Sequence, residues 1–161
     1  MTELALEIPT RDCRIAIVAG EFNHFIVQQL VDGAYDALDR NGVAQQSIQL
    51  AWVPGAFELP LAADVLAASG DYDAVIALGA VIRGGTPHFD YVAGECARGI
   101  ANVGLKHSLP VIFGVLTTDD VDQALERAGS GAGNKGFDTA VAALQMISLM
   151  DRIQVDRNRV E

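Results

Sequence analysis

The hydrophobic and polar positions of this 161-residue chain follow two patterns that alternate along its length. Short apolar runs predict β-strands over residues 14–19, 47–53, 74–82 and 111–117. Longer segments predict helices over residues 25–40, 58–68, 90–107, 121–128 and 138–157. At least the third and fourth strands are continuous apolar runs, which is typical of parallel strands covered on both faces. The sequence therefore predicts an α/β fold, a three-layer α/β/α sandwich with a four-stranded parallel sheet.

The residues between these segments support the same order of elements. Asn41-Gly42 and Ser69-Gly70 follow two predicted helices and favour left-handed helix ends. Asp120 and the two residues before it supply an N-cap for the fourth helix. No linker or change of composition divides the chain, so we expect residues 1–161 to form one domain with residues 1–12 as an N-terminal extension.

Several segments carry more apolar surface than a small domain can bury. Residues 4–8 alternate like a half-buried strand and are expected to pair with a sheet edge, that of a neighbouring subunit included. The helix over 90–107 has few charges, and the helix over 138–157 is apolar most of the way round. Either this apolar surface is buried unusually deeply within one subunit, or it is covered by other subunits. Because a four-stranded sheet leaves little room for such deep burial, we expect a homo-oligomer.

Charge and composition narrow the classes of function. The formal net charge is −10, and an acidic protein repels the phosphates of nucleic acid, so we expect no nucleic-acid partner. No apolar run reaches the ~18 residues of a membrane span, and the first residues do not have the pattern of a signal peptide. A cytoplasmic protein without membrane association is therefore expected.

Cysteine, histidine and glycine patterns give no sign of a metal or nucleotide cofactor. Cys13 and Cys96 form no CxxC pair and are expected to be reduced, unreactive thiols. The three histidines show no metal-ligand spacing. Residues 131–136 match GxGxxG, but a predicted helix, not a strand, precedes them, so we expect no dinucleotide site there.

The loop after the third strand is the first candidate site. In open α/β sheets, ligands bind at the carboxyl ends of the strands, where this loop lies. Gly84 and Gly85 allow close approach of the backbone, Thr86 adds a hydroxyl, and His88 can move a proton near neutral pH. Taken alone, an ordinary turn with a surface histidine explains the loop equally well.

Two other loops end at the same edge of the predicted sheet. Phe22 follows the first strand, where an aromatic ring can stack on a planar heterocycle. Ala56, Phe57 and Glu58 open a helix after the second strand, so their N–H groups would be free to bind a ligand, and the Glu58 carboxylate could accept hydrogen bonds from hydroxyls. Core packing and helix capping are the simpler explanations of each loop alone.

Positive charge is concentrated around a glycine-rich link near the last helix. Arg127 precedes the link and could hold a phosphate with two hydrogen bonds, and Lys135 lies within it. A solvated cation at a helix end is the simpler explanation of Arg127 alone. In combination with the three loops, these features predict one site for an anionic ligand.

The motifs that carry these features occur in a characteristic order. They are Gly20-Glu-Phe-Asn23, residues 52–58, residues 79–84 with Thr86 and His88, residues 89–91, Phe113-Gly114 with Thr117-Thr118, residues 126–129 and residues 133–136. In these motifs the chain resembles the lumazine synthase family from about residue 14 to residue 152. The resemblance implies a flavodoxin-like form of the predicted sandwich and an enzyme of riboflavin biosynthesis that uses no cofactor and no metal.

The resemblance also implies the reaction and the roles of residues. The family joins 5-amino-6-(D-ribitylamino)uracil to 3,4-dihydroxy-2-butanone 4-phosphate, releasing phosphate and water, to give 6,7-dimethyl-8-ribityllumazine. His88 would carry protons, while Gly85, Thr86 and Arg127 would hold the phosphate. Lys135 would be a nearby polar support in the substrate site. The pyrimidine and its ribityl chain would contact the remaining site residues, which are Phe22, Ala56, Phe57, Glu58, Ala80, Val81, Ile82 and, from the adjacent subunit, Phe113.

Finally, the resemblance implies homopentamers, which in some members form a 60-subunit shell, and makes riboflavin synthase a candidate partner. The short link over residues 129–134 favours the shell, while Gly131 stands where related sequences often have lysine. Two rival functions remain: a lumazine- or flavin-binding container on the same fold, and an unrelated sugar-phosphate enzyme. His88 together with Arg127 favours the synthase over a container, and Phe22 with residues 56–58 favours it over the second rival.

Overall fold

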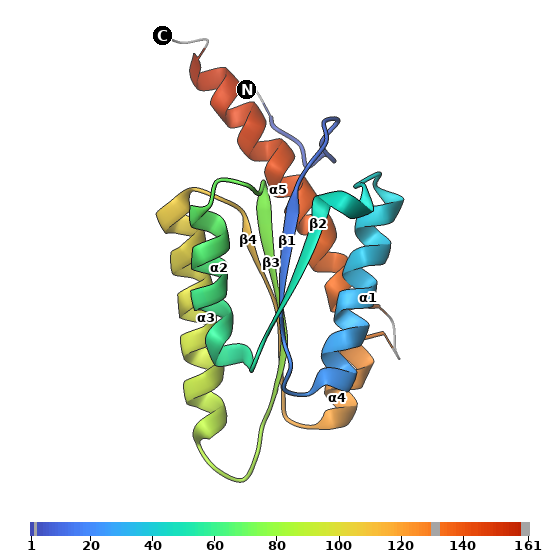
Figure 1. The fold of residues 1–161 in the computed structure, drawn as a ribbon, viewed down its shortest axis with the longest axis vertical. Helices are drawn as coiled ribbons and strands as arrows, with labels where there is room; N and C mark the ends of the chain where they lie inside the picture. The colour runs from blue at the N-terminus through green and yellow to red at the C-terminus, as the bar shows by residue number, and fades with distance from the viewer. Residues whose placement is uncertain (2, 130–132, 159–161) are drawn as a thin grey trace.

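Helices cover both faces of a single sheet in the computed structural model, which describes residues 1, 3–129 and 133–158 (Figure 1). The predicted α/β sandwich is confirmed. The strands are β1 (Ile15–Gly20), β2 (Ile48–Val53), β3 (Ala74–Ile82) and β4 (Val111–Thr118). The helices are α1 (His24–Arg40), α2 (Leu59–Ala68), α3 (His88–His107), α4 (Val121–Arg127) and α5 (Lys135–Asn158), with 3-10 turns at η1 (Gln45–Ser47) and η2 (Ala56–Glu58).

The sheet is parallel throughout, with the strand order β2-β1-β3-β4. This is the order of flavodoxin-like sheets. The first eight residues of β3 are buried, as its continuous apolar run predicts, and so is every residue of β1. The fourth strand was expected to be covered on both faces as well, but four of the eight residues of β4 are not buried in the single chain, because β4 is an edge strand. The chain order reverses between β1 and β3, so the loops that follow these strands diverge and leave a crevice at their carboxyl ends.

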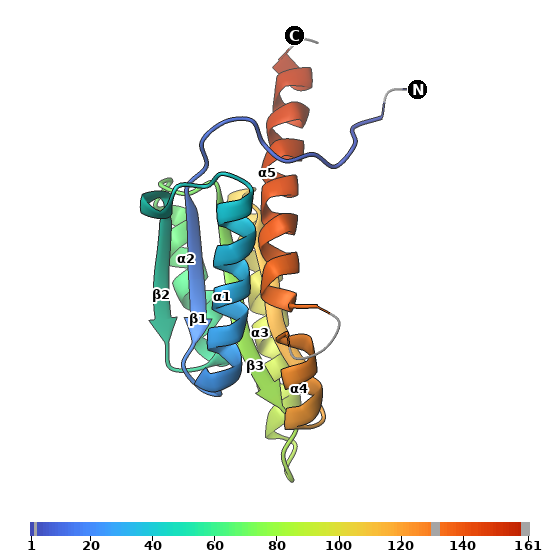
Figure 2. The ribbon, with the colours of Figure 1, turned by 90° about the vertical axis from the view of Figure 1, so that its right-hand side faces the viewer.

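Two hydrophobic cores lie on opposite faces of the sheet. One packs α1 and α5 against residues such as Ile17 and Ile76, and the other packs α2 and α3 against Val18 and Val75. Neighbouring residues of one strand thus enter different cores, because side chains alternate between the faces of a sheet. Figures 1 and 2 show the same arrangement, with α2 and α3 side by side on one face and α1 and α5 on the other.

Some helix boundaries differ from the predicted ones. The third helix starts at His88 and not at residue 90, because Pro87 at its N-cap has φ −69°, which suits a helix start. The fifth helix starts at Lys135 and not at residue 138, since the Asn134 side chain accepts a hydrogen bond from the Phe137 N–H at 3.1 Å. Both His88 and Lys135 are therefore held by the first turn of a helix.

Other predicted helix ends are confirmed. Gly42 and Gly70 have φ of 80° and 76°, the left-handed conformation that ends a helix. Asp120 is the N-cap of α4, and its carboxylate accepts a hydrogen bond from the Gln123 N–H at 2.8 Å. Residues 56–58 form the turn η2, so the second helix proper begins at Leu59.

The N-terminal extension crosses α5 and forms no strand within the described residues (Figure 2). Arg152 of α5 donates a hydrogen bond to the Ala5 carbonyl and lies 3.7 Å from the Glu7 carboxylate. Arg11 joins the end of the extension to Asp151 at 2.7 Å and to Asp73 at 2.9 Å. Pairing of residues 4–8 with a neighbouring subunit stays a prediction.

Both cysteines are free thiols buried in the two cores, as predicted. Burial raises the pKa of the Cys96 thiol to about 11 and also raises the pKa of Cys13. In the described part of the chain, no helix has the length and apolar character needed to span a membrane.

Candidate active site

A pocket of about 690 Å³ opens at the carboxyl ends of β1, β2 and β3. Residues of the β1–α1, β2–α2 and β3–α3 loops line it together with the first turns of α3. We call it the loop pocket. Three loops that are far apart in the sequence meet here because the strands they follow are parallel and adjacent.

Aromatic side chains surround the mouth of the loop pocket. Phe22, Phe57 and Tyr91 are 74%, 57% and 69% exposed in the single chain. The Phe22 N–H donates a hydrogen bond to the Pro54 carbonyl at 3.1 Å, and the Glu21 N–H donates one to the Val53 carbonyl at 2.8 Å. These bonds fix the first loop against the second, so Phe22 and Phe57 border the same cavity.

Asn23 fixes the first loop against the central strand. Its backbone has the left-handed φ of 60°, and its side-chain amide donates a hydrogen bond to the Ala80 carbonyl at 2.9 Å. Sequence reasoning missed this residue, although asparagine is one of the few residues that tolerate a left-handed backbone and so was a usable signal. The bond holds Phe22 close to the end of β3.

The floor of the pocket is apolar and its wall is polar. Ala80 and Val81 at the end of β3 are 4% and 9% exposed, and Ile82 continues the same floor. Glu58 lines the wall at the end of the turn η2. Its N–H donates a hydrogen bond to the Gly55 carbonyl at 3.3 Å, so this amide is not free for a ligand as the sequence suggested. The Glu58 carboxylate is left as the polar group facing the pocket.

Thr86 and His88 complete the lining on the side of α3, with Gly85 in the same exposed loop. Arg83, the first residue after β3, joins the beginning of this loop to the first turn of α3. The Arg83 guanidinium lies 4.3 Å from the centre of the Phe89 ring and 3.5 Å from the Asp90 carboxylate. It also donates a hydrogen bond to Asp119 at 3.1 Å, which ties the loop to the segment after β4. No spacing in the sequence marks Arg83, because its partners come from separate segments.

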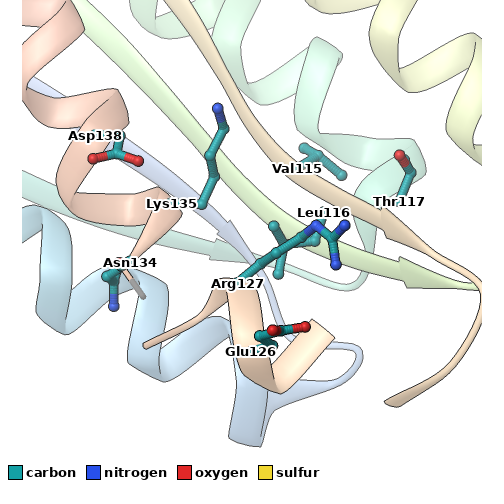
Figure 3. Close-up of a pocket in the computed structure, with 9 residues that line it drawn as sticks. Val115, Leu116, Thr117, Glu126, Arg127, Asn134, Lys135 and Asp138 are labelled. Carbon is teal, nitrogen blue, oxygen red and sulfur yellow. The ribbon is translucent and has the colours of Figure 1, made fainter. Parts of the chain in front are cut away.

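A second pocket of about 540 Å³ lies along β4 and contains the cations (Figure 3). We call it the cation pocket. Arg127 at the end of α4 and Lys135 at the start of α5 reach toward β4, as Figure 3 shows. Arg127 donates a hydrogen bond to the Gln123 carbonyl at 3.1 Å, one turn back in its own helix. Glu126 and Asp138 also line this pocket, so the cations meet acidic neighbours that sequence reasoning did not consider.

Within one chain the two pockets share no lining residue among those described. Arg127 and Lys135 therefore do not lie beside Thr86 and His88 of the same chain. Phe113 lines neither pocket and packs half-buried on the α2–α3 face of β4. The residues that the sequence predicts as one site thus form two groups on each subunit.

Comparison with protein families shows which family the chain that carries these two groups belongs to. The model of the 6,7-dimethyl-8-ribityllumazine synthase family matches residues 12–151. The chain belongs to this family. The resemblance to lumazine synthases is thereby confirmed, and with it riboflavin biosynthesis as the pathway and a transferase as the class of enzyme. The match spans both pockets, while the N-terminal extension precedes it.

The glycine-rich link falls partly on residues that the structure does not describe. Gly131 and the central part of the link, residues 130–132, lie outside the described residues, so the shell prediction that rests on the link stays a prediction.

Among residues 1, 3–129 and 133–158, no group of three or more His, Cys, Asp or Glu side chains has the arrangement of a metal site.

Proposed function

We propose that this protein condenses 5-amino-6-(D-ribitylamino)uracil with 3,4-dihydroxy-2-butanone 4-phosphate to 6,7-dimethyl-8-ribityllumazine, with release of phosphate and water. The observation that carries the proposal is the loop pocket, where exposed aromatic rings, an apolar floor, a carboxylate and a histidine face one cavity in a chain of the lumazine synthase family. Its volume of about 690 Å³ is within the usual range for small-molecule sites.

The lining of the loop pocket suits the pyrimidine substrate. Phe22 at the mouth would stack on the pyrimidine ring, and the floor formed by Ala80, Val81 and Ile82 would exclude water from its other side. Glu58 would accept hydrogen bonds from ribityl hydroxyls, beside the backbone of Ala56 and Phe57. The amino group of the pyrimidine would then face the loop that carries Thr86 and His88.

His88 would move the protons of the condensation. The substrate amine attacks the ketone, and His88 takes a proton from the nitrogen and returns one to the carbinol oxygen, which leaves as water to give an imine. Loss of the C3 proton and of phosphate from the imine leaves an enol, which tautomerises to a ketone at the former C3 hydroxyl. The ribitylamino nitrogen attacks this new carbonyl, and loss of a second water closes the ring. Binding the two substrates side by side contributes a large further factor, since effective molarities can reach ~10⁵ M or more.

The phosphate would be bound by Gly85 and Thr86 of one subunit and by Arg127 of its neighbour, with Lys135 close by. Two observations support a site shared between subunits. The cations belong to a separate pocket of their own chain, and the mouth of the loop pocket exposes apolar rings that a neighbour would cover. Phe113 of the neighbour would approach the pyrimidine from the same side.

The assembly follows from the shared site. We propose a homopentamer, further assembled into a 60-subunit shell, in which residues 4–8 pair with a neighbour's sheet. Ile153 and Val155 near the end of α5 are 38% and 50% exposed and give apolar surface for such contacts. The reaction is proposed to need no cofactor or metal and to take place in the cytoplasm, with riboflavin synthase as a candidate partner. Sedimentation velocity distinguishes a monomer, a pentamer and a shell.

A direct assay tests the proposed reaction. The purified protein is mixed with both substrates, and lumazine absorbance and phosphate release are followed against the uncatalysed reaction. We expect acceleration that falls in Arg127→Ala and in His88→Ala but not in Arg98→Ala, which removes an exposed arginine from the middle of α3. A folded protein that binds lumazine or riboflavin without accelerating the reaction would refute the synthase and indicate a container.

A further inference from the structure

Asn134 makes an unusual number of contacts for one side chain. Its amide nitrogen donates hydrogen bonds to the Gln29 carbonyl of α1 at 2.9 Å and to the Ala128 carbonyl at 2.8 Å. Its amide oxygen accepts a hydrogen bond from the Phe137 N–H at 3.1 Å. The backbones of Ala128 and Asn134 also form an isolated antiparallel bridge. One side chain thus joins α1, the end of α4 and the start of α5.

The Asn134 side chain fits closely against Gly33, and a Cβ at Gly33 or at Gly136 would collide with its surroundings. A Cβ at Gly33 of α1 would lie 2.1 Å from the Asn134 amide oxygen and 2.6 Å from its amide nitrogen. A Cβ at Gly136 would lie 1.8 Å from the Leu30 carbonyl oxygen, so the first turn of α5 packs directly on α1. Both glycines allow the close approach that the hydrogen bonds of Asn134 require.

The two cations are covalently next to these contacts. Arg127 precedes Ala128, which accepts one of the bonds, and Lys135 follows Asn134. The contacts of Asn134 hold the backbone on both sides of the link, whatever the residues between them do.

We propose that Asn134 is a positioning residue for phosphate: it fixes the backbone that carries Arg127 and Lys135, and so sets the spacing at which the two cations meet the phosphate of the butanone substrate. The proposal rests on the proposed function, since it assigns Asn134 to the phosphate half of that site. Its side chain is used entirely for contacts within the protein. It therefore acts on the substrate through Arg127 and Lys135.

Two substitutions on different elements test this role without adding charge. Asn134→Ala removes all three side-chain hydrogen bonds. Gly33→Ala leaves Asn134 in the sequence but places a methyl group where its amide lies. If Gly33→Ala acts through Asn134, adding it to Asn134→Ala will have no further effect, because the nearest atoms that the methyl would meet are gone.

The measurement is a separate KM for each substrate, with kcat and the free energy of unfolding for each variant. A displacement of about 1 Å can reduce the rate about a hundredfold, so we expect kcat/KM for the butanone phosphate to fall about ten- to a hundredfold in both single variants, with a higher KM for this substrate. The KM for the pyrimidine, which binds in the loop pocket, should stay unchanged. The double variant Gly33→Ala, Asn134→Ala should have the same KM for the butanone phosphate as Asn134→Ala alone.

Asn41→Ala is the matched control. Asn41 ends α1 and donates a hydrogen bond to the Ala37 carbonyl at 2.7 Å, so this variant also removes a side-chain bond from asparagine to a helix carbonyl. Its KM for both substrates should equal that of the wild type. The positioning role is refuted if Asn134→Ala lowers only the stability, as Asn41→Ala does, or raises both KM values equally.

The wild-type assay separates failure of this inference from failure of the proposed function. A wild-type protein that forms no lumazine refutes the synthase and the positioning role with it. An active wild type whose Asn134→Ala variant keeps the KM for the butanone phosphate refutes only the positioning role.

Discussion

Replacing Arg83 should weaken catalysis although this residue lines neither pocket among the described residues. Arg83 stands at the end of β3, and its partners Phe89 and Asp90 follow the loop that carries Thr86 and His88. Its third partner, Asp119, lies between β4 and α4. Arg83→Ala removes every one of these side-chain contacts, so the loop loses the group that joins its two ends.

The size of the effect follows from the exposure of the groups. An exposed cation–π contact contributes about 0.5–1 kcal/mol, and an exposed ion pair about 0.2–1 kcal/mol. Arg83 is 46% exposed, and its partners Asp90 and Asp119 are 63% and 70% exposed, so the low ends of these ranges apply to the ion pairs. A total of about 1–1.4 kcal/mol corresponds to a factor of about 5–10 in the ratio of ordered to disordered loop.

Steady-state kinetics with both substrates checks this prediction. We expect kcat/KM of Arg83→Ala to fall about 5- to 10-fold, because only the ordered loop binds productively. Arg83→Lys should be intermediate, since lysine keeps the charge but lacks the planar group that stacks on Phe89. Arg98→Ala is the control, because Arg98 pairs only with Glu95 of its own helix at 3.9 Å in the described chain. If Arg83→Ala and Arg98→Ala have the same kcat/KM, the reasoning is wrong.

Three further predictions concern other parts of the chain. His88→Ala should slow lumazine formation without abolishing it, because substrate positioning persists; complete loss in a folded protein that binds both substrates would contradict this. Gly136→Ala should destabilise the protein by about 1–3 kcal/mol or more in urea unfolding, since its Cβ would lie 1.8 Å from the Leu30 carbonyl oxygen; an unchanged midpoint would contradict the packing. Because the pKa of Cys96 is raised to about 11 from an ordinary value of 9.0, the unfolded thiol ionises first, and stability should fall as the pH rises from 9 to 11. Cys96→Ala should reduce this dependence and leave the smaller part that Cys13 contributes, because burial raises the pKa of Cys13 as well. Urea unfolding at several pH values measures both.

The sheet could be predicted from the sequence because its signals are local. Strands covered on both faces need continuous apolar runs, and β3 shows such a run directly. The edge strand β4 has a similar run but is only half buried in the single chain. The predicted starts of helices were less accurate where a single side chain determines the first residue of the helix. The start of α5 at Lys135 depends on the Asn134 side chain, which accepts a hydrogen bond from the Phe137 N–H as an N-cap does. This signal is local, and the sequence-based boundary at residue 138 passed over it.

The candidate site could be predicted in its parts but not in its arrangement. Each loop shows its chemistry in the sequence, as Thr86 and His88 do after β3. The separation of Arg127 from them depends on which side of the sheet α4 covers, and this follows only from the three-dimensional fold. Arg83 and Asn134 were missed because their roles consist of contacts between distant segments.

The central claim is that each active site combines the loop pocket of one subunit with the cation pocket of its neighbour. Two co-expressed mixtures test it directly, each purified through a different tag on each of its two chains. The first contains the single variants Glu58→Ala and Arg127→Ala, and the second contains wild type and the double variant. If the site is shared, about one quarter of the sites are intact in both mixtures at random assembly, and the two should be equally active. An active second mixture beside an inactive first one would place the whole site within one chain and contradict the account.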